Sequence, residues 1–429
     1  MVDVEPLGGM RMRIFAICFL TVLVDGFDTQ AIGFAAKAMS QSLNIPINLF
    51  GSVFSAGLFG AMLGAFVLGP LGDRFGRRWI LTGCIVVFSA CSVFTAWAHG
   101  LTDLLAYRFL AGLGLGGAIP NVLALSSEYA PRRMRGLFAG VMYAGFPLGG
   151  FVGAIASAQL LPTYGWQPLF YLGGVVPLLL AVLVATVLPE SLKFLIRLSN
   201  GQAQARSVVE RLTGAPVHRD TTLIDEEKVV RGMPIANLFR EGRAKPTLLL
   251  WLTFLNCFVL LIVLVLWTPA LLREAKIGER EAAAIVGLIN LGSVFGTALG
   301  GKLVDRFGVA RVLASLFVAG ALSVAALGQS EHSILLLGLC ATLSGFFVGA
   351  GSSGLLGLAV LAYPTAMRAT GVGWAMAMGR FGQVLGPLAV GLLVASAVPV
   401  TGIFLWCAVP ALLAAALSLL LGRLTSPAR

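Results

Sequence analysis

Two acidic residues stand inside an apolar stretch of the sequence that is long enough to span a membrane. Asp25 and Asp28 lie within a run from about residue 14 to residue 36, and their spacing of three residues places both carboxylates on one face of a helix. Each carboxylate at the centre of a bilayer costs about 2.5–3.5 kcal/mol on insertion scales. Such a pair favours a proton or ion site that faces a water-filled cavity. A buried structural ion pair or a hydrogen-bonded kink is the alternative.

Two arginines, Arg108 and Arg380, fall deep inside other apolar runs. A buried arginine stays protonated, and its guanidinium group presents a fork of donors that fits a carboxylate. Counting residues from the ends of the runs places both arginines and both aspartates at similar depth, which predicts one central charged cluster. Arg108 is predicted to pair with Asp25 or Asp28 and to tune their proton binding. Arg380 has no evident acid in its own half and is predicted to anchor an anion, with pairing to another helix as the alternative.

The elements that carry these residues are predicted from composition and hydropathy. The chain has 429 residues, of which 58% are hydrophobic and 11% charged, whereas soluble domains carry about 25% charged residues. Spanning a bilayer takes about 20 apolar residues. Runs of that size lie near 14–36, 48–70, 79–98, 101–125, 136–160, 166–188, 247–270, 282–304, 312–329, 333–359, 369–394 and 399–422. The sequence therefore predicts an all-α membrane protein with twelve transmembrane helices. Most of the 30 Lys and Arg residues lie in alternate connections and at both ends, which places both termini in the cytoplasm.

The two halves of the chain repeat. The segment GPLGDRFG at 69–76 matches GKLVDRFG at 301–308, and PRRMR at 131–135 matches PTAMR at 364–368, at nearly the same offset. Paired matches of this kind predict two similar bundles related by an axis along the membrane normal. The predicted organisation is an N-terminal six-helix bundle at 1–189, a cytoplasmic linker at 190–245 and a C-terminal six-helix bundle at 246–429.

Several kinds of site are excluded. The six cysteines lie in apolar runs without metal-ligand spacing, so we expect no disulfide, metal or cofactor. The three histidines lie at helix ends or in loops, so proton coupling must use carboxylates. No nucleophile–base pair or phosphate loop is visible, which argues against an enzyme. The net charge of +11 follows from the positive-inside bias and does not indicate a nucleic-acid partner.

Several sequence motifs resemble the signatures of a known family of membrane proteins. The segment 69–78 resembles the loop 2–3 signature of the major facilitator superfamily, and 108–117 resembles its helix 4 motif. Segments 25–29, 368–374 and 379–382 resemble the aromatic acid:proton symporter family. The resemblance implies a proton-coupled importer of a small aromatic carboxylate, such as a benzoate, a hydroxybenzoate or a chlorinated relative, that works by alternating access. It also implies a multi-pass protein of the bacterial inner membrane, and we expect a monomer.

The resemblance also assigns residues to the substrate cavity. The segment around Arg380 resembles helix 11 of organic anion transporters, in which an arginine binds the substrate carboxylate. Aromatic side chains near the predicted cavity are candidates for contact with the ring, and amides are candidates for ring hydroxyl groups. The candidates are Phe27, Phe34, Tyr143, Phe146, Trp267 and Trp374 for the ring, and Asn121, Asn256, Asn290 and Gln383 for its hydroxyl groups.

Charged residues at the predicted inner ends of helices are candidates for gating. A carboxylate at such an end can cap a neighbouring helix and pair with arginine, so Asp73 and Asp305 are predicted to hold the bundles together on the inner side. Glu128 is predicted to form a gate or a structural pair, with a proton site as the alternative. The full gating set is Asp73, Arg77, Arg78, Glu128, Asp305, Arg311 and Arg368.

Two rival functions remain open. A drug:proton antiporter of the same fold would use glycines spaced as Gly136, Gly145 and Gly149, but Gly150 stands where that motif has proline, and buried arginines suit an anionic cargo better. A non-transporting receptor for aromatic acids would need a signalling domain, for which we find no segment. Proton-coupled import of aromatic acids is therefore the leading hypothesis.

Overall fold

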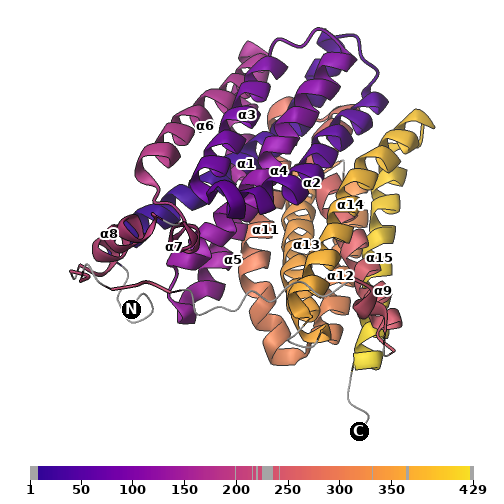
Figure 1. The fold of residues 1–429 in the computed structure, drawn as a ribbon. Helices are drawn as coiled ribbons and strands as arrows, with labels where there is room; N and C mark the ends of the chain where they lie inside the picture. Colours follow the sequence, from indigo (N-terminus) through magenta and orange to yellow (C-terminus); the bar gives the residue numbers. More distant parts are fainter. Residues whose placement is uncertain are drawn as a thin grey trace.

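The computed structural model describes residues 8–198, 200–214, 216–218, 221–224, 235–240, 242–330, 332–363 and 367–425, apart from the side chains of 132, 135, 213, 302, 305–307, 360, 361, 369, 424 and 425. Within these residues all regular structure is helical (Figure 1). The long helices, twelve in the described part, are α1 (Gly9–Ser42), α2 (Phe50–Phe75), α3 (Arg77–Thr95), α4 (Leu101–Tyr129), α5 (Arg135–Tyr164), α6 (Gln167–Val187), α9 (Ala244–Leu266), α11 (Glu279–Phe307), α12 (Val309–Gly328), α13 (Ile334–Ala362), α14 (Arg368–Ala395) and α15 (Val400–Thr425). The short helices are η1 (Ile47–Leu49), η2 (Arg132–Met134), α7 (Leu192–Arg197), α8 (Gln202–Thr213), η3 (Ile235–Phe239) and α10 (Thr268–Glu274).

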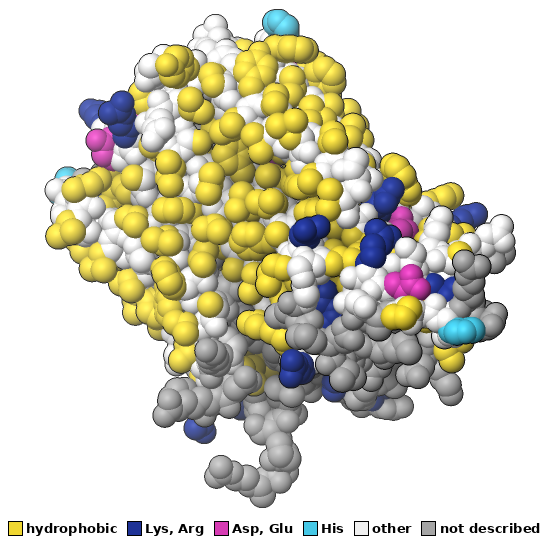
Figure 2. All heavy atoms as spheres, turned by 90° about the vertical axis from the view of Figure 1, so that its left-hand side faces the viewer, with side chains coloured by type: hydrophobic (Ala, Val, Ile, Leu, Met, Phe, Trp, Pro, Cys, Tyr) yellow, Lys and Arg dark blue, Asp and Glu magenta, His cyan; other side chains and the backbone are white. Residues whose placement is uncertain are grey.

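Most of the long helices are suited to a bilayer. Among the described residues, 11 helices are long and apolar enough to cross a membrane, and Figure 2 shows a broad hydrophobic face with charged side chains gathered toward its margins. The remaining long helix, α1, has 34 residues but carries Asp25, Asp28 and Lys37, which lower its mean hydropathy. It packs against α4, α5 and α6 on one side and against α9 and α10 on the other. Its polar residues therefore face protein, and the chain is an all-α membrane protein as predicted.

The long helices pack as two groups. Helices α1–α6, here the N-terminal bundle, contact one another, and helices α9–α15, here the C-terminal bundle, do the same. Figure 1 shows the indigo and magenta helices on one side and the orange and yellow helices on the other. The groups meet mainly where α5 lies against α11 and α2 lies against α14. Helices α7 and α8 pack on the N-terminal bundle through Leu195, Val208 and Val209. The exact bundle boundaries near 189 and 246 stay a prediction.

The sequence repeat corresponds to two matching turns. Gly76 ends α2 with φ +98°, and Gly308 ends α11 with φ +87°, a conformation that glycine adopts without steric cost. The next helix starts at the following residue in both cases, which gives the same sharp reversal in each half. We use "inner end" for the end of the molecule that carries these two turns, in line with the positive-inside bias, and "outer end" for the opposite one.

Small residues allow the helices to approach closely near the charged site. A Cβ atom on Gly112 would lie 1.9 Å from the backbone oxygen of Gly57, and one on Gly116 would lie 1.9 Å from that of Ala61. Helices α2 and α4 are therefore in backbone contact, as small-xxx-small spacing predicts. This contact fixes the position of α4, and with it Arg108, against the rest of the N-terminal bundle.

Candidate functional site

Asp28 lies at the centre of a cluster built by the N-terminal bundle alone. Arg108 Nη2 on α4 donates to Asp28 Oδ2 over 3.0 Å and to the Asp28 backbone oxygen over 3.1 Å. Ser92 Oγ on α3 donates to Asp28 Oδ1 over 2.6 Å. Asp28 is fully buried and Arg108 is 4% exposed, with the guanidinium group 6.0 Å from the ring centroid of Phe170 on α6. Four helices thus meet in one buried ion pair, and the charge of Asp28 is fully compensated.

Asp25 has a different environment one helical turn away. Its carboxylate accepts a single hydrogen bond from the described residues, from Thr29 Oγ1 over 3.3 Å, and the residue is 5% exposed. Its charge interacts with that of Arg380 on α14 of the other bundle. Tyr143 on α5 interacts electrostatically with the same guanidinium group. Asp25 and Tyr143 therefore both lie within electrostatic range of Arg380, which belongs to the other bundle.

The charged residues thus divide into two groups rather than one. The sequence predicts a single cluster, whereas the structure places Arg108 on Asp28 and Arg380 near Asp25. Among the described residues Arg380 makes no ion pair within 4.0 Å, and it is half-buried. Its guanidinium group consequently keeps donors available for an anion, while Arg108 Nη2 is bonded to Asp28 and Arg108 Nη1 has no hydrogen-bond partner among the described residues.

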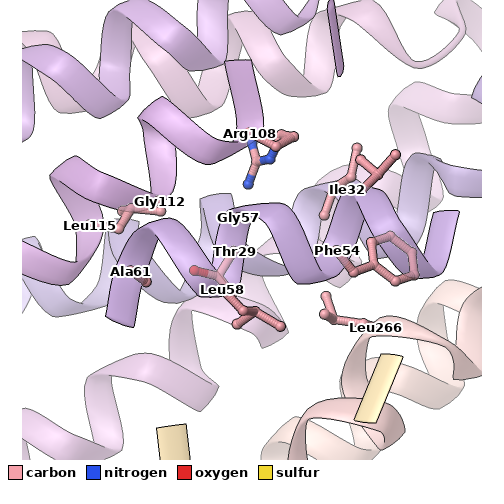
Figure 3. A pocket seen from close by; sticks show the side chains of 11 residues that line it. Thr29, Ile32, Phe54, Gly57, Leu58, Ala61, Arg108, Gly112, Leu115 and Leu266 are labelled. Atoms are coloured by element: carbon pink, nitrogen blue, oxygen red, sulfur yellow. The ribbon is translucent and has the colours of Figure 1, made fainter. Parts of the chain in front are cut away.

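A small cavity lies beside the buried ion pair, between α1, α2, α4 and α9 (Figure 3). Thr29 and Arg108 supply its polar lining, and Ile32, Leu58 and Leu266 are among its apolar lining residues. Its volume of about 30 Å³ has room for one or two water molecules, each of which needs about 10–15 Å³ by this measure. An aromatic acid does not fit there.

The candidate aromatic residues fall into two environments. Tyr143 and Phe146 on α5 are half-buried, and Trp374 on α14 is 40% exposed and stacks on Trp251 at 6.0 Å between ring centroids. Phe27 and Phe34 are buried, both near Gly153 of α5. Trp267 is fully buried, with Nε1 donating to the backbone oxygen of Pro387 over 3.2 Å and its ring edge-on to Phe54. Tyr143 is the candidate that interacts electrostatically with Arg380, whereas Phe146 packs against the core of the N-terminal bundle.

The candidate amides are also distributed unevenly. Gln383 is half-buried and lies three residues after Arg380 on α14, hence on the same helix face. Asn121 Nδ2 donates to the backbone oxygens of Leu68 and Gly117, so it joins α4 to α2 within one bundle. Asn290 bonds to Gln30 across the two bundles. Gln383 is therefore the amide best placed to accompany Arg380.

The inner-end residues form contacts within the N-terminal bundle. Arg77 pairs with Asp73 at 2.8 Å and with Glu128, and Glu128 accepts from Ser191 Oγ over 2.7 Å. Arg78 is bonded through its backbone nitrogen to Glu190 Oε1 over 3.1 Å. These contacts join α2, α3, α4 and the start of α7, and they do not reach the C-terminal bundle. Asp73 therefore makes no described contact with the C-terminal bundle in this structure, and its predicted role between the bundles stays a prediction.

The C-terminal members of the gating set are less defined. Arg311 is exposed at the start of α12, and Arg368 is half-buried at the start of α14. The side chain of Asp305 lies outside the described residues. The proposed symmetry between Asp73 and Asp305 therefore stays a prediction.

Several residues that contribute to the site were not predicted. Ser92 bonds to Asp28 from α3, Gln30 bonds to Asn290 from α1, and Lys37 forms an ion pair with Glu274 near the outer end. Ser55 Oγ donates to the backbone oxygen of Val384 over 2.7 Å and thereby joins α2 to α14. An amide such as Gln30 in an apolar helix was a usable signal, because it needs a partner there. A serine carries no such signal, since it can bond to its own helix backbone.

Comparison with known proteins places the chain in context. The profile of the Major Facilitator Superfamily matches residues 18–276 and 249–429. The chain is 37% identical to the 4-hydroxybenzoate transporter PcaK of Pseudomonas putida, covering 90% of this chain and 86% of that protein. It is 34% identical to a gallate transporter of Pseudomonas putida, covering 98% and 93%. The fold resembles that of a bacterial homologue of the human lysosomal transporter Spinster, in an inward-facing and unoccupied conformation, with a TM-score of 0.73, 17% identity and coverage of 98% and 99%.

Proposed function

Because this chain belongs to the Major Facilitator Superfamily of membrane transporters, we propose that it imports small aromatic carboxylates together with protons. The matched relatives are transporters by name, and the chain is a multi-pass transporter of this superfamily rather than an enzyme. The names of two relatives, for 4-hydroxybenzoate and for gallate, support an aromatic acid as cargo. The observation that carries the proposal is that Asp25 and Arg380, which belong to different bundles, lie within electrostatic range of each other.

Arg380 is the proposed anchor for the substrate carboxylate. It is the permanent positive charge at the boundary, and its guanidinium group can bind a carboxylate through two parallel hydrogen bonds. Tyr143 interacts electrostatically with Arg380, and Gln383 lies on the same face of α14 as Arg380. Tyr143, Phe146 and Trp374 supply aromatic surface at the same boundary. An anionic cargo fits this charge, and a cationic drug does not.

Asp25 is the proposed proton carrier. Asp28 is held by Ser92 and Arg108, so neutralising it would leave a buried arginine without a partner, at a cost of several kcal/mol (about 3–5 for broken buried pairs). Asp25 has one long hydrogen bond and only a distant cation. Protonating Asp25 therefore disrupts little, and Asp28 with Arg108 serves to hold α1, α3 and α4 in place.

Coupling follows from competition for one cation. While Asp25 is ionised it attracts Arg380, and once it is protonated the field of Arg380 acts on the substrate anion instead. The empty site (Asp25 ionised) and the loaded site (Asp25 protonated, anion bound) carry the same net charge. Both states can then convert between the outward-facing and inward-facing conformations at a similar electrostatic cost. A site that holds only the proton or only the anion cannot.

Alternating access is the proposed mechanism of movement. The described hydrogen bonds and ion pairs between the bundles, such as Lys37 with Glu274 and Ser55 with Val384, lie toward the outer end. This arrangement corresponds to an inward-facing state, and we expect the Asp73 contacts to change when the inner end closes. We further propose a bacterial inner-membrane location with both termini in the cytoplasm and a monomeric carrier.

The direct test of cargo is a binding screen with the purified protein. Thermal shifts would be measured with benzoate, 4-hydroxybenzoate and gallate, with benzamide as the uncharged analogue and with octanoate as the aliphatic acid. We expect stabilisation by one or more aromatic acids, none by benzamide, and loss of the effect in Arg380→Gln. Stabilisation by lipophilic cations alone, or equal stabilisation of Arg380→Gln, would contradict the proposal.

A further inference from the structure

A reciprocal pair of amides joins the two bundles. Gln30 Nε2 on α1 donates to Asn290 Oδ1 on α11 over 3.1 Å, and Asn290 Nδ2 donates to Gln30 Oε1 over 2.8 Å. Asn290 Nδ2 also reaches the backbone oxygen of Val286 over 3.1 Å. Gln30 is fully buried and Asn290 is 1% exposed. We call Gln30 and Asn290 the amide pair.

Gly150 makes this contact possible. The side chain of Gln30 crosses α5 at Gly150, where a Cβ atom would lie 2.1 Å from Gln30 Nε2 and 2.5 Å from Gln30 Oε1. Any larger residue at position 150 would displace the amide from Asn290. The glycine that departs from the antiporter motif in the sequence therefore has a physical reason in this chain, because it provides the space through which Gln30 passes.

The amide pair differs from the other polar contacts between the bundles. Lys37 and Glu274 are 23% and 55% exposed, so water screens their attraction. Ser55 bonds to a backbone oxygen and does so with one hydrogen bond. The amide pair has two hydrogen bonds, side chain to side chain, with both partners buried. Parting the bundles at this point leaves two amides without partners until water enters.

We propose that the amide pair, which lies five residues outward of Asp25 on α1, is the contact that keeps the two bundles closed on the outer side of Asp25, and that Gly150 is the positioning residue that lets Gln30 reach Asn290. This inference rests on the proposed alternation between two facings, but not on the identity of the cargo. Because both amides are uncharged, the contact can break and re-form without competing with Asp25 or Arg380 for a proton or an anion. Asn290 is thus a gate residue in this state, with its donors and acceptor already engaged.

The proposal is tested by measuring distances in the purified full-length carrier without substrate. Spin labels on Thr163→Cys and Arg280→Cys report the outer end, and labels on Arg133→Cys and Arg311→Cys report the inner end. All four native residues are exposed, and the six native cysteines are buried. Double electron–electron resonance then gives the populations of open and closed outer ends.

We expect Gln30→Ala and Asn290→Ala each to raise the ratio of open to closed outer ends roughly five- to tenfold. This follows from two interhelical hydrogen bonds at about threefold each, the average found in membrane proteins. The double variant should move the ratio no further than either single variant. The exchanged pair Gln30→Asn with Asn290→Gln should restore part of the closed population, which a merely structural role would not.

Gly150→Ala provides an independent variant. It should shift the ratio as far as Gln30→Ala does, and it should add nothing when combined with Gln30→Ala, because the side chain that it obstructs is then absent. Gly140→Ala on the same helix is the matched control, since a Cβ atom at that position meets nothing within 4 Å. Asn256→Ala controls for loss of an amide that bonds within its own helix.

Two results would overturn the proposal. One is an unchanged outer distance distribution in both Gln30→Ala and Asn290→Ala. The other is a pair of shifts that simply add in the double variant. Neither result depends on which acid is carried, so a failure of this proposal would leave the proposed cargo untouched. Equally, a cargo other than an aromatic acid would leave the expected outer-end distances unchanged.

Discussion

Asp25 and Asp28 lie one turn apart on the same face of α1, but their surroundings differ. Asp28 is fully buried within one bundle, with Ser92 and Arg108 bonded to its two carboxylate oxygens. Asp25 accepts one bond from Thr29 and faces Arg380 on the other bundle. A difference of three residues therefore separates a carboxylate that is fully paired inside one bundle from one whose nearest described cation belongs to the other bundle.

The difference indicates how a membrane helix can carry two acids with separate roles. A buried charge is tolerated when it is paired and its hydrogen bonds are satisfied, and Asp28 meets both conditions without any ligand. Asp25 meets them only in part, because its cation belongs to the opposite bundle. The incomplete partner is what allows a proton and an anion to replace it, so we assign structure to Asp28 and coupling to Asp25.

The largest expected effect on stability comes from breaking the buried ion pair between Asp28 and Arg108. Arg108→Ala leaves Asp28 charged and buried, which costs about 3–5 kcal/mol for a broken buried ion pair. We expect a large drop in the yield of folded protein and in its thermal unfolding temperature, measured in detergent. Arg311→Ala, which removes an exposed arginine, is the control. An unfolding temperature equal to that of the unmodified protein would show that the Asp28 pair is not structural.

A smaller effect is expected from replacing Arg380, the cation that interacts with Asp25. Arg380→Gln removes a charge-assisted contact to the substrate, about 1.5–3 kcal/mol, which corresponds to an affinity for the aromatic acid that is 10- to 100-fold weaker. Stability should change little, because Arg380 makes no ion pair within 4.0 Å among the described residues. Calorimetric titration measures the affinity, with Arg311→Gln as control. Unchanged affinity together with a large loss of stability would reverse the two roles.

The smallest expected effects come from the hydroxyl partners of the two carboxylates. Ser92→Ala removes a 2.6 Å bond to buried Asp28 and should lower stability by about 1–3 kcal/mol, the cost of an unsatisfied buried group. Thr29→Val removes the 3.3 Å bond to Asp25 and should cost less. Ser89→Ala is the matched control on α3, because the Ser89 hydroxyl group has no partner among the described residues. Equal losses of stability in Ser92→Ala and Thr29→Val would contradict the distinction between a structural Asp28 and a weakly held Asp25.

Much of the fold could be predicted from the sequence, because its signals are long and repeated. Each of the twelve apolar runs corresponds to a long helix of the structure, and the two glycine turns at 76 and 308 follow the sequence repeat. Helix lengths are less accurate: α1 extends from Gly9 to Ser42, beyond the predicted run at both ends. The residues added at both ends are largely polar, so hydropathy alone does not indicate that the helix continues through them. That all twelve helices cross the membrane, with both termini inside, stays a prediction.

The site could be predicted only in part, because depth along a helix is readable and rotation about its axis is not. Depth placed Asp25, Asp28, Arg108 and Arg380 at one level, but which acid faces which arginine depends on the packing of four helices. Under the proposed alternating access, the contacts of Asp73, and of Asn290 with Gln30, would also depend on which end of the molecule is closed. A sequence that has to satisfy two conformations does not specify the contacts of either one alone.

The most direct test of the central claim is transport by Asp25→Asn in proteoliposomes with an imposed proton gradient. Two quantities would be measured with radiolabelled 4-hydroxybenzoate: accumulation above equilibrium, and exchange of labelled for unlabelled substrate without a gradient. We expect Asp25→Asn to lose accumulation and keep exchange, since asparagine resembles the protonated carboxyl group and leaves Arg380 free for the anion. Accumulation by Asp25→Asn equal to that of the unmodified carrier would contradict the assignment of the proton to Asp25.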